Sequence, residues 1–378
     1  MTPTVTVLPD DAHNQALVAN VHPADWPNPE PRNRYNLVVI GAGTAGLVCA
    51  AGAAGLGARV ALIEHHLLGG DCLNTGCVPS KALIRAARAA HEARSGEAYG
   101  LRPDPEGALP DFAAIMARMR RLRAEISRHD SARRFRDQLG VDVFLGEARF
   151  TGADCIEVAG RQLTFHRAAL CTGARAALPD IPGLSAAEPL TNETLFTLTS
   201  LPRRLAVLGG GPVGCEMAQA FARFGSRVTL VQHGPQLLAR EDSEVADLLA
   251  TVFAREGIEV RLGSRVTGVR IEGAERVLDL NGAGGADQLR VDAILVAAGR
   301  APNVEGLGLD TAGIEIDRHG VRVDDRLRTT NPRVFAAGDI CSPFKFTHAA
   351  DAQARILLAN ALFFFFQAED GIRDRNVT

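Results

Sequence analysis

The sequence of 378 residues lacks a charge excess, an apolar leader and a hydrophobic run of membrane length. Its formal net charge is −3, which offers no electrostatic attraction to nucleic acid or to an anionic membrane surface. The first residues carry acids and contain no apolar core of a signal peptide. No uninterrupted apolar run reaches the roughly 18 residues that a membrane helix needs. We therefore expect a cytoplasmic protein with no nucleic-acid or membrane partner.

Tryptophan occurs once, and the seven cysteines are an odd number scattered through apolar segments. This cysteine usage argues against a secreted disulfide framework and for a reducing compartment. Hydrophobic residues make up 46% and charged residues 22%, which is typical of a globular protein with large cores. The 38 glycines suit many tight turns between strands and helices, and the length suffices for two domains.

A nucleotide-binding pattern begins at the apolar strand Leu37–Ile40, which runs into the glycine turn GAGTAG. In this turn Gly41 allows the tight bend, Gly43 lets the backbone approach a pyrophosphate, and Gly46 lets helix and strand pack closely. The amides at the start of the helix would face the phosphates. A second apolar strand then ends at Glu64, where an acid can accept both ribose hydroxyls of an adenosine. The pattern predicts a dinucleotide site.

The same order of strand, glycine turn, helix and strand returns from Leu205 onward. Its glycines are Gly209, Gly211 and Gly214, and the place of the ribose-binding acid is taken by Gln232. An amide there lacks the carboxylate that would repel a 2′-phosphate, which favours NADPH and leaves NADH possible. Two such copies in one chain predict two dinucleotides, or one dinucleotide and a relic.

These patterns predict an α/β protein with two Rossmann-like domains. Residues 1–34 are polar and Pro-rich and are interpreted as an extended arm. Further helices are expected over 78–98, about 111–138 and Thr347–Leu362, and short strands over Val60–Ile63, Val141–Leu145, Cys155–Val158 and Ala168–Cys171. The helix over 111–138 is rich in arginine, which we interpret as a solvated face rather than an anion site.

The stretch GGDCLNTGCVPSK contains Cys72 and Cys77, and such a pair fits a structural disulfide, a metal clip or a redox pair. No second pair of cysteine or histidine ligands follows at close spacing, so we expect no metal site. Pro79 favours a helix over Val78–Ile84, which places Cys77 near a helix N-terminus, where the dipole favours a thiolate. A redox pair fits best, and we interpret the other five cysteines as small core residues.

The same stretch resembles the active-site signature of the class I pyridine nucleotide-disulfide oxidoreductases. Further motifs join it in that family's order: GAGTAG with its acid ahead of it, and CTGARA, GGGPVGCE, AAGRAPN and VFAAGDI after it. Together they cover the chain from about Tyr35 to Leu362. The amino-acid sequences of these segments are similar to those of the mercuric reductase-like branch of the family.

The resemblance implies an FAD- and NAD(P)H-dependent enzyme. Electrons would pass from the nicotinamide through the flavin to a Cys72–Cys77 disulfide and on to an acceptor. Cys77 would be the thiolate beside the flavin, Cys72 the thiol that meets the substrate, and Lys81 a flavin-side lysine paired with Glu216. The resemblance further implies these FAD- and NAD(P)-binding residues: Gly41, Gly43, Gly46, Glu64, Gly70, Asp71, Thr172, Gly173, Gly209, Gly211, Gly214, Gln232, Gly299, Arg300, Gly338, Asp339 and Thr347.

The family's domain order implies a discontinuous FAD-binding domain interrupted by an NAD(P)-binding domain. We expect the first over residues 35–190 plus 311–362 and the second over 191–310. Two positions depart from the family pattern: Asp71 stands where many members have threonine, and Pro212 replaces an aromatic residue found in some relatives.

The C-terminal part departs most from the family pattern. The family's dimer-forming domain, with its His-Glu acid/base pair, has no counterpart after Leu362, so a homodimer is expected only for a full-length parent. Residues 363–378 begin with a phenylalanine run and continue with QAEDGIRD, which resembles a translated sequencing adapter. We interpret them as a non-native tail.

The acceptor is expected to be a small-molecule disulfide or thiol, or mercuric ion. Two alternatives differ in kind. One is a diaphorase that passes electrons to quinones or dyes without using the cysteines, and the other is an inactive fragment that only binds FAD.

Overall fold

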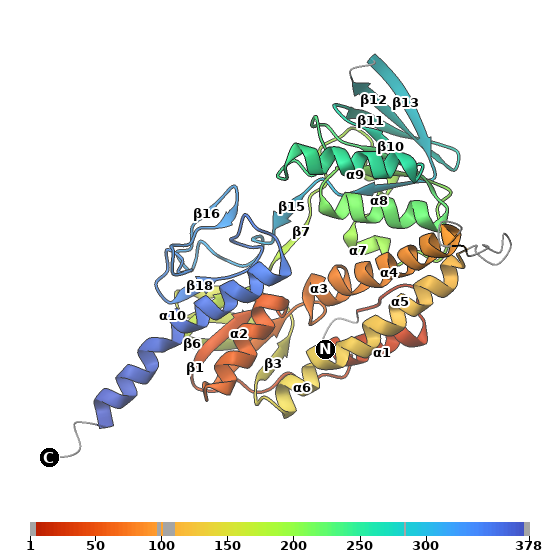
Figure 1. Cartoon of the computed structure of the whole chain (residues 1–378). Coiled ribbons are helices and arrows are strands. Elements are labelled where there is room, and N and C mark those ends of the chain that lie inside the picture. The colour runs from red at the N-terminus through yellow and green to blue at the C-terminus, as the bar shows by residue number, and fades with distance from the viewer. Residues whose placement is uncertain (1–4, 97–99, 101–109, 283–284, 374–378) are drawn as a thin grey trace. The chain divides into compact units, whose positions relative to one another are not determined.

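The computed structural model describes residues 5–96, 100, 110–282 and 285–373, with side chains described up to Leu362. Figure 1 shows the chain, which divides into two compact units. The first unit comprises Met1–Asn74, Arg123–Arg175 and Ala301–Thr378, and the second comprises Thr75–Leu122 and Ala176–Arg300. The chain leaves the first unit at strand β7 (Ala174–Ala176) and returns at β15 (Arg300–Pro302).

The first unit is built on a sheet with β1 (Tyr35–Ile40) at its centre, between β2 (Val60–Glu64) and β6 (Arg161–Leu170). These three strands are parallel, and β1 and β2 are buried along nearly their whole length, as a sheet covered on both faces requires. The sheet is completed by β3 (Asp142–Leu145), β4 (Ala148–Gly152), β5 (Cys155–Val158) and β18 (Val334–Ala336).

Helix α2 (Thr44–Gly55) crosses from β1 to β2, and α10 (Thr347–Arg373) packs on α2. A Cβ at Gly52 would lie 2.5 Å from Leu358 Cδ1, so the small residue lets the two helices approach closely. The other short elements of this unit are α1 (Ala12–Val21), α3 (Gly70–Asn74), η2 (Ser127–Asp130), α6 (Ala132–Asp137), β16 (Ile316–Asp317) and β17 (Gly320–Val321).

The second unit repeats the parallel arrangement in the strand order β10-β9-β8-β14. Its parallel strands are β8 (Arg204–Leu208), β9 (Arg227–Val231), β10 (Glu259–Arg261) and β14 (Ala293–Val296). An antiparallel sheet adds β11 (Arg265–Glu272), β12 (Glu275–Gly282) and β13 (Gly285–Val291). The helical elements are α4 (Cys77–Arg94), η3 (Ser185–Ala187), α7 (Asn192–Leu195), α8 (Pro212–Phe224) and α9 (Ser243–Arg255).

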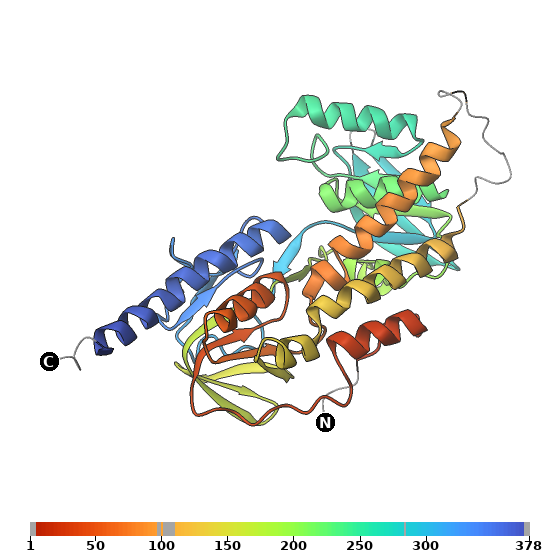
Figure 2. The same ribbon diagram turned by 60° about the horizontal axis from the view of Figure 1, so that its bottom comes forward.

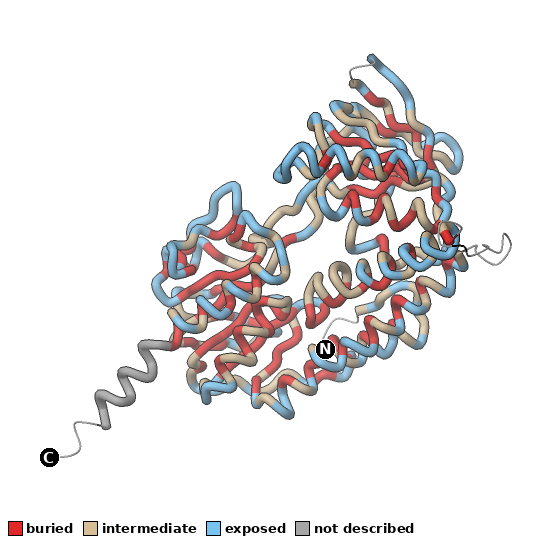
Figure 3. The backbone as a smooth tube through the Cα atoms, viewed as in Figure 1, coloured by how far each residue is buried: buried red, intermediate tan, exposed pale blue. Residues whose placement is uncertain are grey.

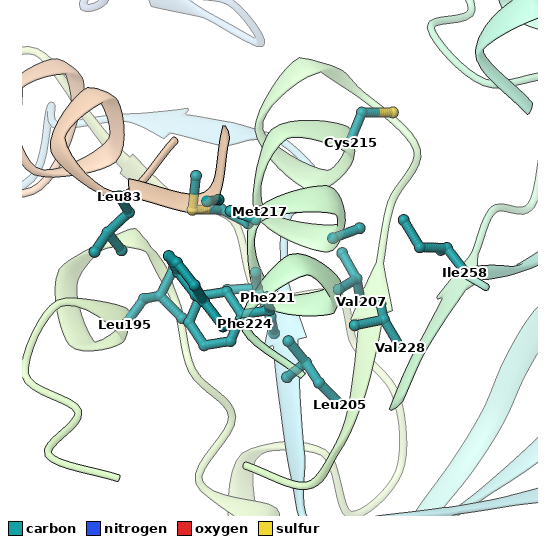
Figure 4. Close-up of a cluster of buried hydrophobic side chains, with 14 of the residues drawn as sticks. Leu83, Leu195, Leu205, Val207, Cys215, Met217, Phe221, Phe224, Val228 and Ile258 are labelled. Atoms are coloured by element: carbon teal, nitrogen blue, oxygen red, sulfur yellow. The ribbon is translucent and has the colours of Figure 1, made fainter. Parts of the chain in front are cut away.

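The core of the second unit lies between α4, α8 and the parallel sheet. Figure 4 shows Leu83 of α4 facing Met217 and Phe221 of α8, and all three side chains are at most 1% exposed. Phe221 and Phe224 also stack edge to face, with ring centroids 6.2 Å apart. Each such side chain contributes roughly 2–3 kcal/mol through burial. This packing explains why residues 75–94 cluster with the second unit, although they follow the first glycine turn in sequence.

The parallel strands of both units are confirmed, and so is the helix expected over 78–98 as far as Arg94, where α4 ends. Residues 97 and 98 of that expectation lie outside the described residues. The helix expected over 111–138 is interrupted, because α5 (Phe112–Ile126) gives way to η2 and α6. Its arginines are not all solvated: Arg120 is 8% and Arg123 2% exposed, so the solvated-face interpretation is wrong for these two. Helix α10 runs on to Arg373 rather than ending at Leu362, in line with the helix-favouring Gln, Ala and Glu residues there.

The N-terminal segment differs from the extended arm that its prolines suggested. Helix α1 begins after Asp11, whose side chain accepts hydrogen bonds from the His13 and Asn14 amides as an N-cap. Figures 1 and 2 both show α1 beside α6, and Figure 3 shows buried positions along it. Leu17 and Val21 are fully buried, so apolar burial outweighs the turn-forming tendency of the flanking residues.

Among the described residues no helix is long and apolar enough to cross a membrane.

Candidate active site

The first glycine turn has little room for any side chain. Gly41 has φ +95°, and a Cβ there would lie 2.4 Å from the carbonyl oxygen of Cys171. A Cβ at Gly46 would lie 1.8 Å from the Gly41 carbonyl oxygen. Gly43 is the N-cap residue of α2, and a Cβ there would meet only Gly70 Cα, at 3.7 Å. The turn therefore packs on itself and on the Cys171 backbone just after β6, while the position of Gly43 at the start of α2 has room, as phosphate binding at a helix N-terminus requires.

Glu64 lies at the end of β2 and is 7% exposed. Its Oε2 accepts a hydrogen bond from the Ala42 amide at 2.7 Å, and its Oε1 accepts one from the His66 amide at 2.8 Å. His65 Nδ1 lies 3.2 Å from Oε1. Burial raises the pKa of Glu64, but His65 and the two amides together outweigh it and leave the pKa below its ordinary value. The carboxylate is thus ionised and held against the glycine turn.

Because the folded-state pKa of Glu64 is lowered, its ionised form stabilises the fold above its ordinary pKa of about 4.3. That stabilisation is lost as the pH falls through the folded-state pKa. Glu64→Gln is expected to lower the free energy of unfolding by roughly 1–3 kcal/mol at pH 7, with the gap shrinking below about pH 4. Thermal unfolding between pH 3 and 8 measures this. Glu188→Gln, at an exposed position, should have the same free energy of unfolding as the wild type at each pH. A Glu64→Gln gap that stays constant down to pH 3 would contradict the account.

The second glycine turn reproduces the first. Gly209 has φ +111°, with its Cβ position 2.5 Å from the Ala297 carbonyl oxygen, and a Cβ at Gly214 would lie 1.9 Å from the Gly209 carbonyl oxygen. The Gly210 amide donates to Gln232 Oε1 at 3.0 Å, as the Ala42 amide donates to Glu64. Gln232 is 7% exposed, and its bonded oxygen leaves the amide nitrogen as a donor for a ligand.

The other predicted binding residues of the first unit gather around the first turn or on the strand ends beside it. Gly70 has φ +53°, and a Cβ there would lie 2.6 Å from Gly43 Cα. Thr172 and Gly173 follow β6 and are tied to Asn303: the Thr172 hydroxyl donates to the Asn303 carbonyl at 2.8 Å, and the Asn303 amide donates to the Gly173 carbonyl at 3.0 Å.

Gly338 follows β18, and its amide donates to the Gln353 side chain at 2.7 Å. A Cβ at Gly338 would lie 3.4 Å from the Ala45 Cβ, which places the Gly338 backbone beside the start of α2. Asp339 comes next and is half-buried, as is Asp71 in the first turn of α3. Thr347 is the first residue of α10.

The remaining predicted residues of the second unit lie at turns. Gly211 is the N-cap residue of α8, and a Cβ there would meet nothing within 4 Å. Gly299 has φ +126°, and its carbonyl accepts a hydrogen bond from the Ala177 amide at 3.0 Å. Arg300 is the first residue of β15. Each unit thus offers one open helix N-terminus and one buried side chain at the next strand end, the set that an adenine dinucleotide requires.

The two cysteines of the predicted redox pair lie on consecutive helices. Cys72 lies in α3, within the first unit, and Cys77 is the first residue of α4, within the second. Both are half-buried. The expected position of Cys77 at a helix N-terminus is confirmed, one residue ahead of the Val78 start expected from Pro79.

Cys77 shares its surroundings with Lys81, one helical turn later, and with Glu216 on α8. Burial raises the pKa of Glu216, the positive charge of Lys81 lowers it, and Cys77 raises it. In the part of the chain that the structure describes, Lys81 and Glu216 form no direct ion pair. The three groups nevertheless act on one another electrostatically, and the packing of α4 on α8 brings them together.

Three of the other five cysteines are core residues, as expected: Cys49, Cys171 and Cys215 are at most 6% exposed. Burial, followed by the nearby Glu216, raises the pKa of Cys215 to about 11. Cys155 and Cys341 are half-buried instead, and burial raises the pKa of Cys341 to about 12. No group of three or more His, Cys, Asp or Glu side chains among the described residues could hold a metal ion.

One buried polar cluster next to Cys72 was not predicted from the sequence. It joins Asn14 of α1, Arg123 of α5 and Asn74 of α3. A signal was present in the spacing, because Arg123 follows the buried Met116 and Met119 at helical intervals and therefore shares their face. An arginine on an apolar helix face is expected to be paired with buried oxygen atoms.

A glycine turn of the dinucleotide-binding type in each unit, together with the cysteine pair of α3 and α4, is typical of flavoprotein-like oxidoreductases, and comparison with known proteins agrees. Residues 35–354 match the family described as pyridine nucleotide-disulphide oxidoreductase. The chain is 33% identical over 336 residues to mercuric reductase from Bacillus cereus, covering 89% of this chain and 53% of that protein. It is 35% identical to dihydrolipoyl dehydrogenase from Thermus scotoductus, covering 86% of this chain and 70% of that protein.

A solved structure is also similar: the HOCl-induced flavoprotein disulfide reductase RclA from Escherichia coli, with a TM-score of 0.76 and 30% identity. That match covers 86% of this chain and 70% of the RclA chain. The chain belongs to the pyridine nucleotide-disulphide oxidoreductase family. Membership implies FAD and a pyridine nucleotide as cofactors. The chain spans about half of the Bacillus cereus mercuric reductase.

Proposed function

We propose that this chain carries an NAD(P)H-dependent disulfide oxidoreductase centre in which Cys72 and Cys77 form the redox pair. The observation that carries the proposal is the placement of Cys77 at the first position of α4, with the charges of Lys81 and Glu216 beside it. A helix N-terminus favours a thiolate, and the lysine adds positive charge to the same region. The family match supplies the chemistry that such a thiolate serves.

The residues of the first unit would hold FAD. Gly41, Gly43 and Gly46 would cradle its pyrophosphate, Glu64 its adenosine ribose, and Asp339 the remainder of its polar chain. Gly70, Asp71, Thr172, Gly173, Gly338 and Thr347 would complete the site. When bound, FAD supplies the step that converts a hydride from a nicotinamide into two electrons for a disulfide.

The second unit would hold the nicotinamide nucleotide, which we propose to be NADPH. Gly209, Gly211 and Gly214 would bind its pyrophosphate, and Gly299 and Arg300 would complete the site. Gln232 supports the choice of NADPH, because its free amide nitrogen can donate to a 2′-phosphate without charge repulsion. On this proposal residues 35–190 plus 311–362 form the FAD-binding domain, and residues 191–310 form the NAD(P)-binding domain.

The thiol chemistry follows from the two reduced cysteines. The Cys72 thiolate would attack one sulfur of a disulfide acceptor, forming a mixed disulfide and releasing the first thiol. Cys77 would then attack Cys72 Sγ, which releases the second thiol and leaves a Cys72–Cys77 disulfide. A dithiol can also bind a soft metal ion, and mercuric reductases are among the similar proteins. We propose a small-molecule disulfide or thiol, or mercuric ion, as the acceptor, and a cytoplasmic location. A homodimer is proposed only for a full-length parent protein.

The test compares acceptors on the purified FAD-loaded chain. NADPH oxidation is measured with a panel of low-molecular-weight disulfides, with mercuric ion, and with a quinone. The proposal predicts turnover of a disulfide or mercuric ion that requires both cysteines, and a higher kcat/KM with NADPH than with NADH. Turnover of the quinone alone, unchanged in Cys72→Ser, would instead assign a diaphorase.

A further inference from the structure

Residues 9–28, called the arm from here on, form part of the N-terminal segment 1–34. They precede the segment that matches the family, which begins at residue 35. It is nevertheless an integral part of the first unit. Trp26 is 6% exposed, and its Nε1 donates to the Val143 carbonyl at 3.0 Å. Asn28 bonds Leu145 in both directions, its amide nitrogen donating to the carbonyl at 2.9 Å and its oxygen accepting from the amide at 2.7 Å. These bonds fix one end of the arm on β3.

The other end of the arm contacts the segment that leads to Cys72. The Leu68 amide donates to the Val21 carbonyl at 3.2 Å. The His22 side chain hydrogen-bonds through Nδ1 to the carbonyl of His66. Val21 and His22 are at most 1% exposed, so these bonds are shielded from water. The arm therefore holds the backbone immediately before α3.

Arg123 joins the arm to α3 itself. Its Nη1 donates to the Asn74 carbonyl at 2.6 Å, and its Nη2 donates to Asn14 Oδ1 at 2.8 Å. Asn14 is fixed in turn, because its amide nitrogen donates to the Pro9 carbonyl at 2.8 Å. Arg123 is 2%, Asn14 1% and Asn74 5% exposed. A buried guanidinium that uses both ends of its fork sets the separation of its two partners.

Helix α3 depends on such support. It is only five residues long, and a single turn is not stable without external contacts. Asn74 closes it from within, its side-chain nitrogen donating to the Leu68 carbonyl at 3.1 Å and the Gly70 carbonyl at 2.9 Å. Arg123 binds the last carbonyl of this turn, two residues after Cys72. The position of the Cys72 backbone is thus determined from both sides by the arm and by Arg123.

We infer that Asn14 and Arg123 are positioning residues for Cys72, and that the arm is a working part of the thiol site. The inference rests on the proposed function, because it concerns the redox pair. Loss of the hydrogen bond between Arg123 and Asn14 would let the segment around the reduced Cys72 sample more conformations. Closing the Cys72–Cys77 disulfide would then cost more conformational entropy, so the disulfide would be reduced more readily.

The experiment measures the equilibrium between the Cys72–Cys77 disulfide plus two reduced glutathiones and the dithiol plus oxidised glutathione. Tryptic cleavage gives the peptide Val60–Lys81, whose only two cysteines are Cys72 and Cys77, so alkylation and mass measurement report this pair. Asn14→Ala is expected to shift the equilibrium toward the dithiol by about tenfold, which corresponds to about 30 mV. Asn14→Asp keeps an acceptor for Arg123 but loses the donor to the Pro9 carbonyl, so its shift should be smaller than that of Asn14→Ala.

Asn20→Ala is the matched control. Asn20 also lies on α1 and its side chain also donates a hydrogen bond to another segment, to Ser127 Oγ at 2.9 Å, but among the described residues it forms no hydrogen bond with Arg123 or α3. The inference predicts a shift in Asn14→Ala that Asn20→Ala lacks. An equal shift in both, or a shift below about twofold in Asn14→Ala, would overturn it. If Asn14→Ala does not fold, Arg123→Lys is measured instead. We expect it to shift the equilibrium toward the dithiol severalfold, and the absence of this shift would overturn the inference.

A failure of the proposed function gives a different result. In that case Cys72 and Cys77 of the wild-type protein would not interconvert between disulfide and dithiol at any glutathione ratio. The positioning inference would then be overturned together with the proposed function. If the wild type interconverts and the Asn14 variants do not differ from it, only the positioning role is lost.

Discussion

Cys77→Ser is expected to lower kcat/KM for a disulfide acceptor by at least about a thousandfold, while NADPH oxidation by a quinone continues. Serine occupies the same place at the start of α4 but forms neither a thiolate at neutral pH nor a disulfide with Cys72. The mixed disulfide on Cys72 would then have no internal partner to resolve it. Steady-state rates with both kinds of acceptor measure the effect.

A matched control for this prediction is Cys155→Ser. Cys155 is also half-buried, and its sulfur donates to Gln162 Oε1 at 2.9 Å, a bond that a serine hydroxyl can replace. The control should keep both activities within about twofold of the wild type. If Cys77→Ser retained disulfide turnover, the cysteine pair would have no part in the reaction.

Gly46→Ala is expected to reduce the FAD content of the purified protein by at least about tenfold. The added Cβ would lie 1.8 Å from the Gly41 carbonyl oxygen, so the glycine turn would have to shift away from α2. A backbone shift of this kind costs roughly 3 kcal/mol or more. The flavin absorbance per mole of protein and the melting temperature measure it.

Two further glycine variants show whether the effect is specific. Gly55→Ala changes the same helix, but a Cβ there meets nothing within 4 Å, so FAD content should be unchanged and stability equal or higher by about 0.5–1 kcal/mol. Gly214→Ala should keep FAD and lose NADPH-dependent reduction, since its Cβ would lie 1.9 Å from the Gly209 carbonyl oxygen of the second turn. Full FAD content in Gly46→Ala would mean that the first turn does not hold the flavin nucleotide.

The parallel strands and both glycine turns were predictable from the sequence because their signals are local. An apolar strand, a glycine turn and a small-residue helix determine one another within about thirty residues. The repeat of this unit from Leu205 then predicted a second copy. Cys77 could be placed at a helix start for the same reason, since Pro79 restricts the backbone around it.

The arm and the Arg123 cluster were less predictable because they depend on contacts distant in sequence. The bond from Arg123 to Asn14 spans 109 positions, and neither residue signals it alone. Prolines around α1 suggested an extended segment, whereas burial of Leu17 and Val21 selects a helix. The grouping of α4 with the second unit likewise follows from packing on α8, which sequence order does not reveal.

The most direct test of the central claim is whether NADPH reduces the Cys72–Cys77 pair. The FAD-loaded chain is oxidised, treated with NADPH under anaerobic conditions, and alkylated, and the peptide Val60–Lys81 is then weighed. The account predicts that both cysteines of this peptide become labelled after NADPH addition and remain unlabelled without it. Reduction of the flavin with no change in the labelling of this peptide would contradict the account.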